Sequence, residues 1–374
     1  MKTIAERTFG LTIIVLKIVG FYPTNNCKIL HKFYGIVLYI VAMIPVTILS
    51  LLHFVYMKDL SEFKTNDFVM VALVFYTFKL PPCLINKNKI KNCIHYFDDP
   101  IYSAVKEEHK KIIEECIAVC RRNFNVFLIS CITGTSGFVL SAAINVEMLP
   151  VNVWLPKSFI DEPVIFQIVR FLTFLVIVYA LLTCGTVDPL IAALCYQATA
   201  QIQILKKNLQ GLGGDFENKF SSEETFQTIK KCAQHHESIL NFIREVQNCF
   251  SLVVFFQFAG SSVVIAVISF QMSKVTGVDF LITLNDFGVL FFQIFFYCYY
   301  GSLLMEESNG LSSAIYLSRW YECDVRCKKA LIVFMEHSKK PMVITAGRLL
   351  PLSLDTFTMV FRRAYSLVAV LKNY

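Results

Sequence analysis

Motifs for catalysis and for metal binding are missing from this sequence of 374 residues. It has no G-x-S-x-G, no H-E-x-x-H and no glycine-rich loop that could cradle a phosphate, which argues against the common hydrolases, zinc proteases and nucleotide-dependent enzymes. Cys116/Cys120 and Cys323/Cys327 are i,i+4 pairs, but no histidine or second pair has zinc-site spacing beside either. We therefore expect no enzymatic activity, no cofactor and no metal, and we interpret these thiols as ordinary buried ones.

Two further absences concern the surface. There is no Asn-x-Ser/Thr acceptor for N-glycosylation, and no cysteine falls in segments 57–66, 147–164 or 273–282, the connectors predicted below to be external. We therefore expect no extracellular disulfide. The adjacent pair His235-His236 lies in a polar helical segment, and we interpret it as solvated surface.

Apolar residues are abundant instead. They make up 55% of the chain, whose mean hydropathy is +0.56, more than a soluble protein of this length needs. Basic residues give a net charge of +7, but they stand beside apolar stretches, which favours a membrane boundary over a nucleic-acid partner. Seven stretches are long enough to cross a bilayer. We predict spans at 33–56, 67–86, 124–146, 164–198, 247–272, 284–305 and 341–371.

The density of Lys and Arg alternates between successive connectors. The N-terminal segment and every second connector after it are rich in basic residues, and the others hold few. Because positive loops remain in the cytoplasm, we predict a cytoplasmic N-terminus and, after seven crossings, an extracellular C-terminus. A G-protein-coupled receptor would have the opposite orientation, which makes that class a weak alternative.

The cytoplasmic segments have helical periodicity. Residues 4–21 are predicted to form a short amphipathic helix at the inner leaflet, and span 4 continues without a breaker until Gly211. Residues 199–246 and 306–340 supply further helices of an intracellular anchor bundle. The predicted fold class is thus an all-α membrane protein with one domain, seven transmembrane helices and this bundle.

Features of a carrier are missing as well. No acid–base pair recurs within the spans as a proton relay would require, and no paired Gly/Pro breaks mark discontinuous helices. A secondary transporter is therefore a weaker alternative than a receptor or a channel.

Two stretches near the carboxyl end resemble the insect odorant receptor family, specifically its odorant-tuned members. Residues 298–321 read CYYGSLLMEESNGLSSAIYLSRWY, and residues 341–371 begin PMVITAGRLLPLSLDTF and end AYSLVAVL. Weaker similarity occurs at Leu16–Pro23 and at Thr186-Val187-Asp188 followed by residues 203–206. The resemblance covers the whole predicted topology.

The resemblance implies an odorant-gated, non-selective cation channel in the plasma membrane of olfactory dendrites. It implies a heterotetramer with the shared odorant co-receptor around one central pore lined by the last span, with membrane lipid and a small volatile odorant as further partners. The short connector between spans 4 and 5 argues against the co-receptor itself. A gustatory-type receptor channel of the same superfamily is the nearest alternative.

The family gate aligns with the end of the last span. The resemblance implicates Val368 as an apolar ring that closes by dewetting, with Leu371 one turn further on the same side and Tyr365 in the same stretch.

Arg362 and Arg363 fall near mid-membrane in this alignment. We expect one of them to face the aqueous vestibule and the other to pair with a carboxylate such as Asp355 or Glu306.

The resemblance places the odorant site in the outer half of the membrane, among spans 2, 3, 4 and 6. An apolar pocket needs aromatic and small side chains with few polar groups, although a residue of this kind taken alone is more often in ordinary helix packing or lipid contact, by about two to one. Such a site holds a small, mostly apolar ligand by dispersion and shape. The candidates are Val71, Phe75, Tyr76, Ser136, Gly137, Leu140, Phe171, Phe174, Leu175, Phe287, Leu290 and Phe291.

Overall fold

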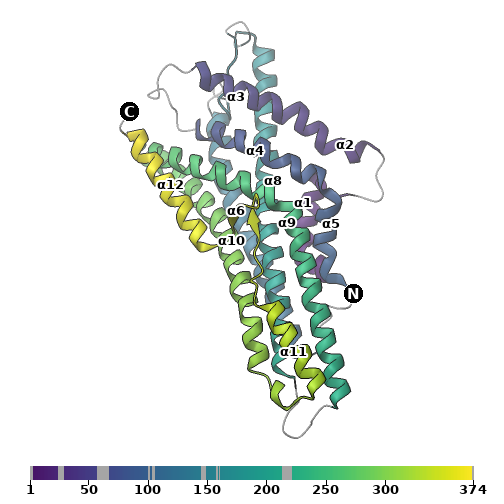
Figure 1. Ribbon diagram of the computed structural model, residues 1–374. Coiled ribbons are helices and arrows are strands. Elements are labelled where there is room, and N and C mark those ends of the chain that lie inside the picture. Colours follow the sequence, from purple (N-terminus) through teal and green to yellow (C-terminus); the bar gives the residue numbers. More distant parts are fainter. Residues whose placement is uncertain are drawn as a thin grey trace.

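Helices make up nearly all of the described chain in the computed structural model (Figure 1). The structure describes residues 3–23, 29–56, 67–99, 106–144, 149–156, 161–212 and 221–372, together with Tyr102 and Phe159. In chain order the elements are α1 (Ile4–Val19), α2 (Ile29–Leu38), the π-helical turn η1 (Tyr39–Met43), α3 (Ile44–Tyr56), α4 (Asp67–Ile85), α5 (Lys87–His95), the 3₁₀ turn η3 (Tyr96–Asp98), α6 (Glu107–Ile144), α8 (Pro163–Gln210), α9 (Ser222–Met272), α10 (Gly277–Tyr316), the 3₁₀ turn η5 (Trp320–Glu322), α11 (Val325–Ser338), β1 (Thr345–Ala346), β2 (Leu350–Pro351) and α12 (Leu354–Lys372).

Six of the described helical stretches have the length and apolar composition needed to cross a bilayer. Each overlaps one of the first six predicted spans, and the predicted class of all-α, multi-pass membrane protein is confirmed. The six stretches are Phe33–Tyr56, Phe68–Ile85, Glu107–Gly137, Pro163–Gln210, Ser222–Met272 and Phe280–Glu322.

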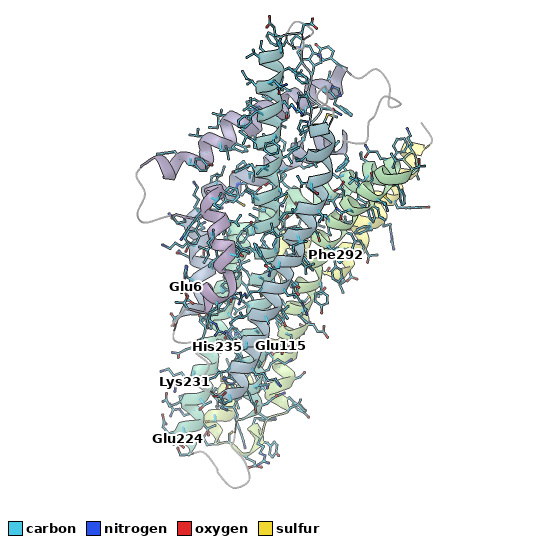
Figure 2. The ribbon with its side chains drawn as sticks, turned by 180° about the vertical axis from the view of Figure 1, so that it is seen from behind. Glu6, Glu115, Glu224, Lys231, His235 and Phe292 are labelled. Atoms are coloured by element: carbon cyan, nitrogen blue, oxygen red, sulfur yellow. The ribbon has the colours of Figure 1, made fainter. Side chains whose placement is uncertain are left out.

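Three helices are much longer than a bilayer is thick. α8, α9 and α10 contain 48, 51 and 40 residues, whereas about 20 suffice for a crossing. Their surplus turns gather with the start of α6 and with α11 at the lower end of the molecule (Figure 1). We call residues 106–122, 199–212, 222–246 and 306–338 the lower bundle. Exposed charges such as Glu224 and Lys231 surround it, so it lies outside the hydrocarbon (Figure 2).

The long helices begin and end where the sequence provides signals. The Ser221 hydroxyl accepts the Glu224 backbone N–H and the Glu224 carboxylate accepts the Ser221 N–H, which forms a capping box at the start of α9. Pro163 occupies the first turn of α8, and Gly211 follows its last residue, as the unbroken sequence predicts.

The prediction that His235-His236 is solvated surface is wrong, because both side chains are buried. The His235 ring contacts Tyr102 edge-on at 5.4 Å and forms a 3.2 Å hydrogen bond with the Gln201 side-chain carbonyl. The His236 ring contacts Phe334 of α11 at 5.3 Å. Adjacent residues on a helix point about 100° apart. Both rings can therefore be buried only because other elements cover this part of α9 on two sides.

The predicted last span, 341–371, is also wrong at its start: the helix begins only at Leu354. The preceding residues form a β-hairpin in which Thr345 pairs with Pro351 and Ala346 with Leu350. Three residues separate the strands, and Gly347 and Arg348, both with a φ of 60°, are the central residues of a turn that the Leu349 N–H closes by donating to the Ala346 carbonyl. This left-handed turn, with prolines on either side of it, interrupts what hydropathy suggests is one continuous helix.

The hairpin is fastened to the neighbouring helices by polar groups. The Gln247 side chain of α9 accepts the Thr345 N–H at 2.7 Å and donates to the Thr345 carbonyl at 2.8 Å. On the other side Leu352 lies against Gly301 of α10, where an added Cβ would overlap the Leu352 carbonyl oxygen. The hairpin thus fixes where α12 starts relative to α9 and α10.

Candidate functional site

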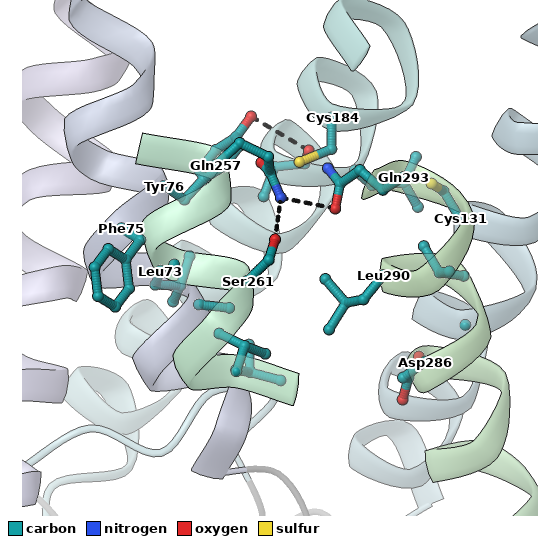
Figure 3. Close-up of a pocket in the computed structure, with 18 of the residues that line it drawn as sticks. Leu73, Phe75, Tyr76, Cys131, Cys184, Gln257, Ser261, Asp286, Leu290 and Gln293 are labelled. Atoms are coloured by element: carbon teal, nitrogen blue, oxygen red, sulfur yellow. Dashed lines mark hydrogen bonds between the residues drawn. The ribbon is translucent and has the colours of Figure 1, made fainter. Parts of the chain in front are cut away.

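A cavity of about 230 Å³ lies among the predicted spans, between α4, α6, α8, α9 and α10 (Figure 3). Most of the side chains that line it are apolar, among them Phe68, Leu73 and Val264. A small apolar cavity with few polar groups is the usual form of a site for a small molecule.

A cluster of polar side chains closes one end of this cavity. Lys79 Nζ lies 2.5 Å from Asp188 Oδ1 and 2.7 Å from the Gln257 side-chain oxygen. The Tyr297 hydroxyl donates to Asp188 Oδ1 at 2.5 Å, and the Gln293 amide donates to the other oxygen of the same carboxylate. We call Lys79, Asp188, Gln257, Gln293 and Tyr297 the polar cluster.

The polar cluster joins four helices by groups that satisfy one another. Lys79 and Asp188 belong to α4 and α8, and their side chains are only 3% and 2% exposed. The Gln257 amide also donates to the Gln293 side-chain oxygen and to Ser261 Oγ, both at 2.8 Å. Because a buried charge is costly without a partner, this network fixes how α4, α8, α9 and α10 pack around the cavity.

Asp286 lies at the other end of the cavity lining. Figure 3 shows it beyond Leu290, away from Gln257 and Gln293. Asp286 precedes Gln293 by two helical turns on α10, which separates them by roughly 10 Å along the axis. The cavity is therefore apolar in its middle and carries a different polar group at each end.

Three of the residues predicted for the ligand site line this cavity: Phe75, Tyr76 and Leu290. The Tyr76 hydroxyl points toward the Ala180 carbonyl of α8, 3.4 Å away. Phe75 packs against Gly260 of α9, where an added Cβ would lie 2.6 Å from the Phe75 Cβ.

Four other predicted residues lie elsewhere. Phe171 and Phe174 are 61% and 38% exposed on the outside of α8. Ser136 is exposed on α6, and Gly137 faces Ile282 of α10. Lipid is as apolar as a protein core, so hydropathy alone does not tell an outward aromatic residue from one that lines a cavity.

The remaining predicted residues are also outside the lining. Leu175 and Phe287 are half-buried in helix contacts, and the Phe291 ring packs against Phe357 and Phe361 of α12 at 5.3 and 5.4 Å. Leu140 belongs to α6, but its side chain lies outside the described residues.

Val71 lines a second space, an apolar groove of about 310 Å³ between α3, α4 and α9 that we call the outer groove. Leu51, Phe54 and Val267 also line it. Phe75 borders both the outer groove and the cavity, so its side chain is part of the wall between them.

The charged members of the site escaped sequence analysis although a signal existed. Lys79, Asp188 and Asp286 stand within otherwise apolar spans, and ionisable residues at such depth usually mark a functional site. Helical periodicity alone does not show which of these charged residues face one another across the helices.

α12 has an inner and an outer face. Val360 and Ala364 are buried, and Phe357 and Phe361 meet Phe291 of α10. Outward from this face Tyr365 is 77% exposed.

The residues predicted for the gate and vestibule lie on or beside the outer face. Val368 is half-buried, and the side chain of Leu371 lies outside the described residues. Arg362 and Arg363 are both exposed, and neither forms an ion pair with a described carboxylate. The predicted pairing with Asp355 or Glu306 is therefore wrong, since the two arginines point away from the subunit.

The lower bundle holds a third space, a cavity of about 390 Å³ lined by Lys106, His109, Lys231 and His235 among others. Burial lowers the pKa of His109, and burial together with the neighbouring His109 and His236 lowers the pKa of His235 to about 4. Both rings are thus neutral at physiological pH. Among the described residues, no group of three His, Cys, Asp or Glu side chains could hold a metal ion.

Comparisons with known proteins agree with one another. The family model described as 7tm Odorant receptor matches residues 59–365. Odorant receptor Or1 of Anopheles gambiae is 22% identical over 98% of this chain and 95% of its own length. Odorant receptor 43b of Drosophila melanogaster is 24% identical over 80% of this chain and 73% of its own.

A solved structure has the same fold. The insect olfactory receptor OR5 from Machilis hrabei, in complex with eugenol, superposes with a TM-score of 0.83. The superposition covers 98% of this chain and 97% of that one at 15% sequence identity.

Proposed function

This chain belongs to the insect odorant receptor family, and on that premise we propose that it is the odorant-binding subunit of a heteromeric, odorant-gated, non-selective cation channel. Members of this family are ligand-gated channels rather than enzymes. The cavity between α4, α6, α8, α9 and α10 is the proposed odorant site. The observation that carries the proposal is a small apolar cavity within the membrane part of a receptor of this fold.

The size and lining of the cavity support a small, mostly apolar ligand. A volume of about 230 Å³ admits a compact organic molecule, held by dispersion contacts with side chains such as Phe75 and Leu290. The structure of OR5 from Machilis hrabei contains eugenol, a small aromatic molecule.

The composition of α12 supports its role as the pore-lining helix. Of the described helices, α12 is not among the six that are apolar enough to cross a bilayer by composition. Its outer face presents Arg362, Arg363 and Tyr365, whereas its inner face is aromatic. A helix with one polar face crosses a membrane when that face meets water or other subunits, as in a central pore.

We propose that the pore is completed by the shared odorant co-receptor in a tetramer. The alternation of basic connectors supports a cytoplasmic N-terminus, a cytoplasmic lower bundle and an extracellular C-terminus, in the plasma membrane of a sensory dendrite. With Arg362 and Arg363 on the exposed face of this subunit, the other subunits supply the pore surface that attracts cations.

Adjacent residues of α10 offer a route from ligand to pore. Leu290 lines the cavity, and the next residue, Phe291, packs on Phe357 and Phe361 of α12. A ligand that contacts the open arrangement of α10 better than the closed one shifts the equilibrium toward opening.

Expression with the co-receptor tests the proposal directly. Cells that carry both chains should give inward currents to some members of a volatile odorant panel, and cells with the co-receptor alone should not respond to those members. A correctly assembled surface complex that passes no current with any panel member would contradict the proposed function.

Val368 is the proposed gate residue, since an apolar ring closes a pore by excluding water. Val368→Ser should let current leak without odorant, and Val368→Trp should reduce the evoked current by about tenfold or more. Leu367→Trp is the matched control, because the neighbouring residue points about 100° away on the helix. Leak and evoked current that remain unchanged in both Val368 variants would remove Val368 from the gate.

A further inference from the structure

We propose that the cavity selects odorants that carry a hydrogen-bond donor, an N–H or O–H group, and that Asp286 is the residue that recognises it. The proposal rests on the proposed function of the cavity as the odorant site. It adds the chemical class of the ligand and the end of the cavity at which its polar group lies.

The polar cluster at the other end of the cavity offers a ligand little. Both oxygens of Asp188 accept hydrogen bonds, and Lys79 Nζ has two oxygen partners. The Gln257 amide and the Gln293 amide are engaged with neighbours in the same way. A ligand donor that bonded to Asp188 would share a carboxylate that already accepts three hydrogen bonds, so the net affinity that a donor gains at this end is small.

Asp286 is different because it lacks such partners. Its Oδ2 atom is buried and has no hydrogen-bond partner among the described residues. Its neighbours in the lining are apolar or already engaged: Leu290 is aliphatic, and the Thr135 hydroxyl donates to the Cys131 carbonyl at 2.9 Å. No cation of the described chain forms an ion pair with Asp286.

Gly134 of α6 leaves the space that the carboxyl group occupies. A Cβ added there would lie 2.7 Å from Asp286 Oδ1 and 2.9 Å from the Asn285 amide nitrogen. That amide nitrogen is also buried and without a partner among the described residues, so it does not satisfy the carboxyl group. The close approach of α6 and α10 at Gly134 therefore holds an unsatisfied carboxyl group at the cavity wall.

A carboxyl group with an open acceptor in an apolar space is costly, and a donor on the ligand offsets the cost. An ammonium group adds charge attraction to the hydrogen bond, and a hydroxyl group supplies the bond alone. An ether or a hydrocarbon of the same shape leaves the acceptor unsatisfied. Sites of this kind discriminate strongly against a ligand that lacks the matching group, whereas an apolar wall distinguishes methylene groups only weakly.

The test uses matched ligands on several carbon frames, for example phenylethyl, hexyl and cyclohexylmethyl. Each frame is presented as the amine, the alcohol, the methyl ether and the hydrocarbon to the complex with the co-receptor. On frames that fit, the amine and the alcohol should act at concentrations about tenfold lower than the ether, which corresponds to one hydrogen bond. The ratio of amine to alcohol potency shows which donor is preferred.

Three variants connect this preference to the carboxyl group. Asp286→Leu removes the acceptor and should reduce the donor-to-ether potency ratio to about one. Asp286→Asn keeps a carbonyl acceptor without the charge and should weaken the amine more than the alcohol. Gly134→Ala should reduce the ratio by displacing the Asp286 side chain. Leu290→Ala, on the same wall of α10, should change the potency of all four members of a frame by similar factors. Surface labelling of each variant separates loss of preference from loss of expression.

Ethers and hydrocarbons as potent as amines and alcohols, or a panel in which no donor-bearing member acts, would overturn the proposal. So would a donor preference that persists in Asp286→Leu. A direct agonist of the co-receptor serves as the positive control. A complex that opens to that agonist and to some panel members, but without a preference for donors, is a failure of this inference alone. A complex that opens to that agonist and to no panel member is a failure of the proposed function.

Discussion

The buried pair of Lys79 and Asp188 allows a quantitative test of what holds the membrane helices together. Lys79→Met leaves Asp188 with two donors, from Gln293 and Tyr297. Asp188→Leu leaves Lys79 with one acceptor, the Gln257 side chain. Breaking a buried pair costs about 3–5 kcal/mol, because the remaining charge is uncompensated. We expect Lys79→Met near the lower value and Asp188→Leu near the upper one.

The double variant separates the pair from its parts. With Lys79→Met and Asp188→Leu combined, neither charge of the pair remains buried, so the protein should be more stable than with Asp188→Leu alone. Thermal unfolding of the purified complex, followed by size-exclusion chromatography after heating, measures the difference. Each kcal/mol should lower the midpoint by roughly 1–2 °C in a chain of 374 residues.

An exposed ion pair provides the control. Lys207 and Glu108 meet at 3.1 Å in the lower bundle with side chains 45% and 73% exposed, so Lys207→Met should lower the unfolding midpoint far less than either variant of the buried pair. If the double variant loses as much stability as the sum of the two single variants, the two side chains act independently. Compensation between the two charges would then not be what stabilises this packing.

Two further outcomes are expected. Gly301→Ala should destabilise the receptor by about 1–3 kcal/mol in the same thermal assay, because the added Cβ would overlap Leu352 at the hairpin. Gly288→Ala is the control, since Gly288 has open space around it, and equal unfolding midpoints for the two variants would contradict the prediction. Burial lowers the pKa of His235 to about 4, whereas the pKa is about 6.5 in the unfolded chain. Between these two values only the unfolded chain gains a proton, so the stability of the folded protein falls as pH decreases through this window. The loss at pH 5.5 should be about 1.4 kcal/mol and should be smaller in His235→Gln but unchanged in the surface variant His337→Gln; a pH profile identical in both variants would contradict it.

The sequence was sufficient for the fold class because the bilayer imposes a simple pattern. Long apolar stretches and the absence of a breaker before Gly211 predict helices that the structure confirms, α8 among them. The hairpin at Thr345–Pro351 could not be read in the same way. Its turn depends on Gly347 and Arg348 adopting a left-handed conformation, which is stabilised by Gln247 and Ser251 from a helix about a hundred residues earlier.

The ligand cavity was less predictable for a related reason. Phe75 and Phe171 are both aromatic residues in apolar spans, yet one borders the cavity and the other faces outward. Their difference lies in how far each helix is rotated about its own axis, and hydropathy carries no such information when lipid and interior are equally apolar. Charged residues inside apolar spans are a better signal, although the site prediction did not use it, since Lys79 and Asp188 both face inward.

Phe75, which lines both the cavity and the outer groove, affects which odorant concentration determines the response of this receptor. An odorant dissolved among acyl chains at the groove is separated from the cavity there by the wall to which Phe75 belongs. If the cavity is the odorant site, as proposed, and odorants enter through this wall, the concentration that acts is the one in the bilayer rather than the one in the surrounding fluid. Each methylene group added to an odorant raises its partition into hydrocarbon by about fourfold. Potency within a homologous series therefore combines partition into the bilayer with recognition by the cavity. Only potency corrected for partition reports the shape of the site.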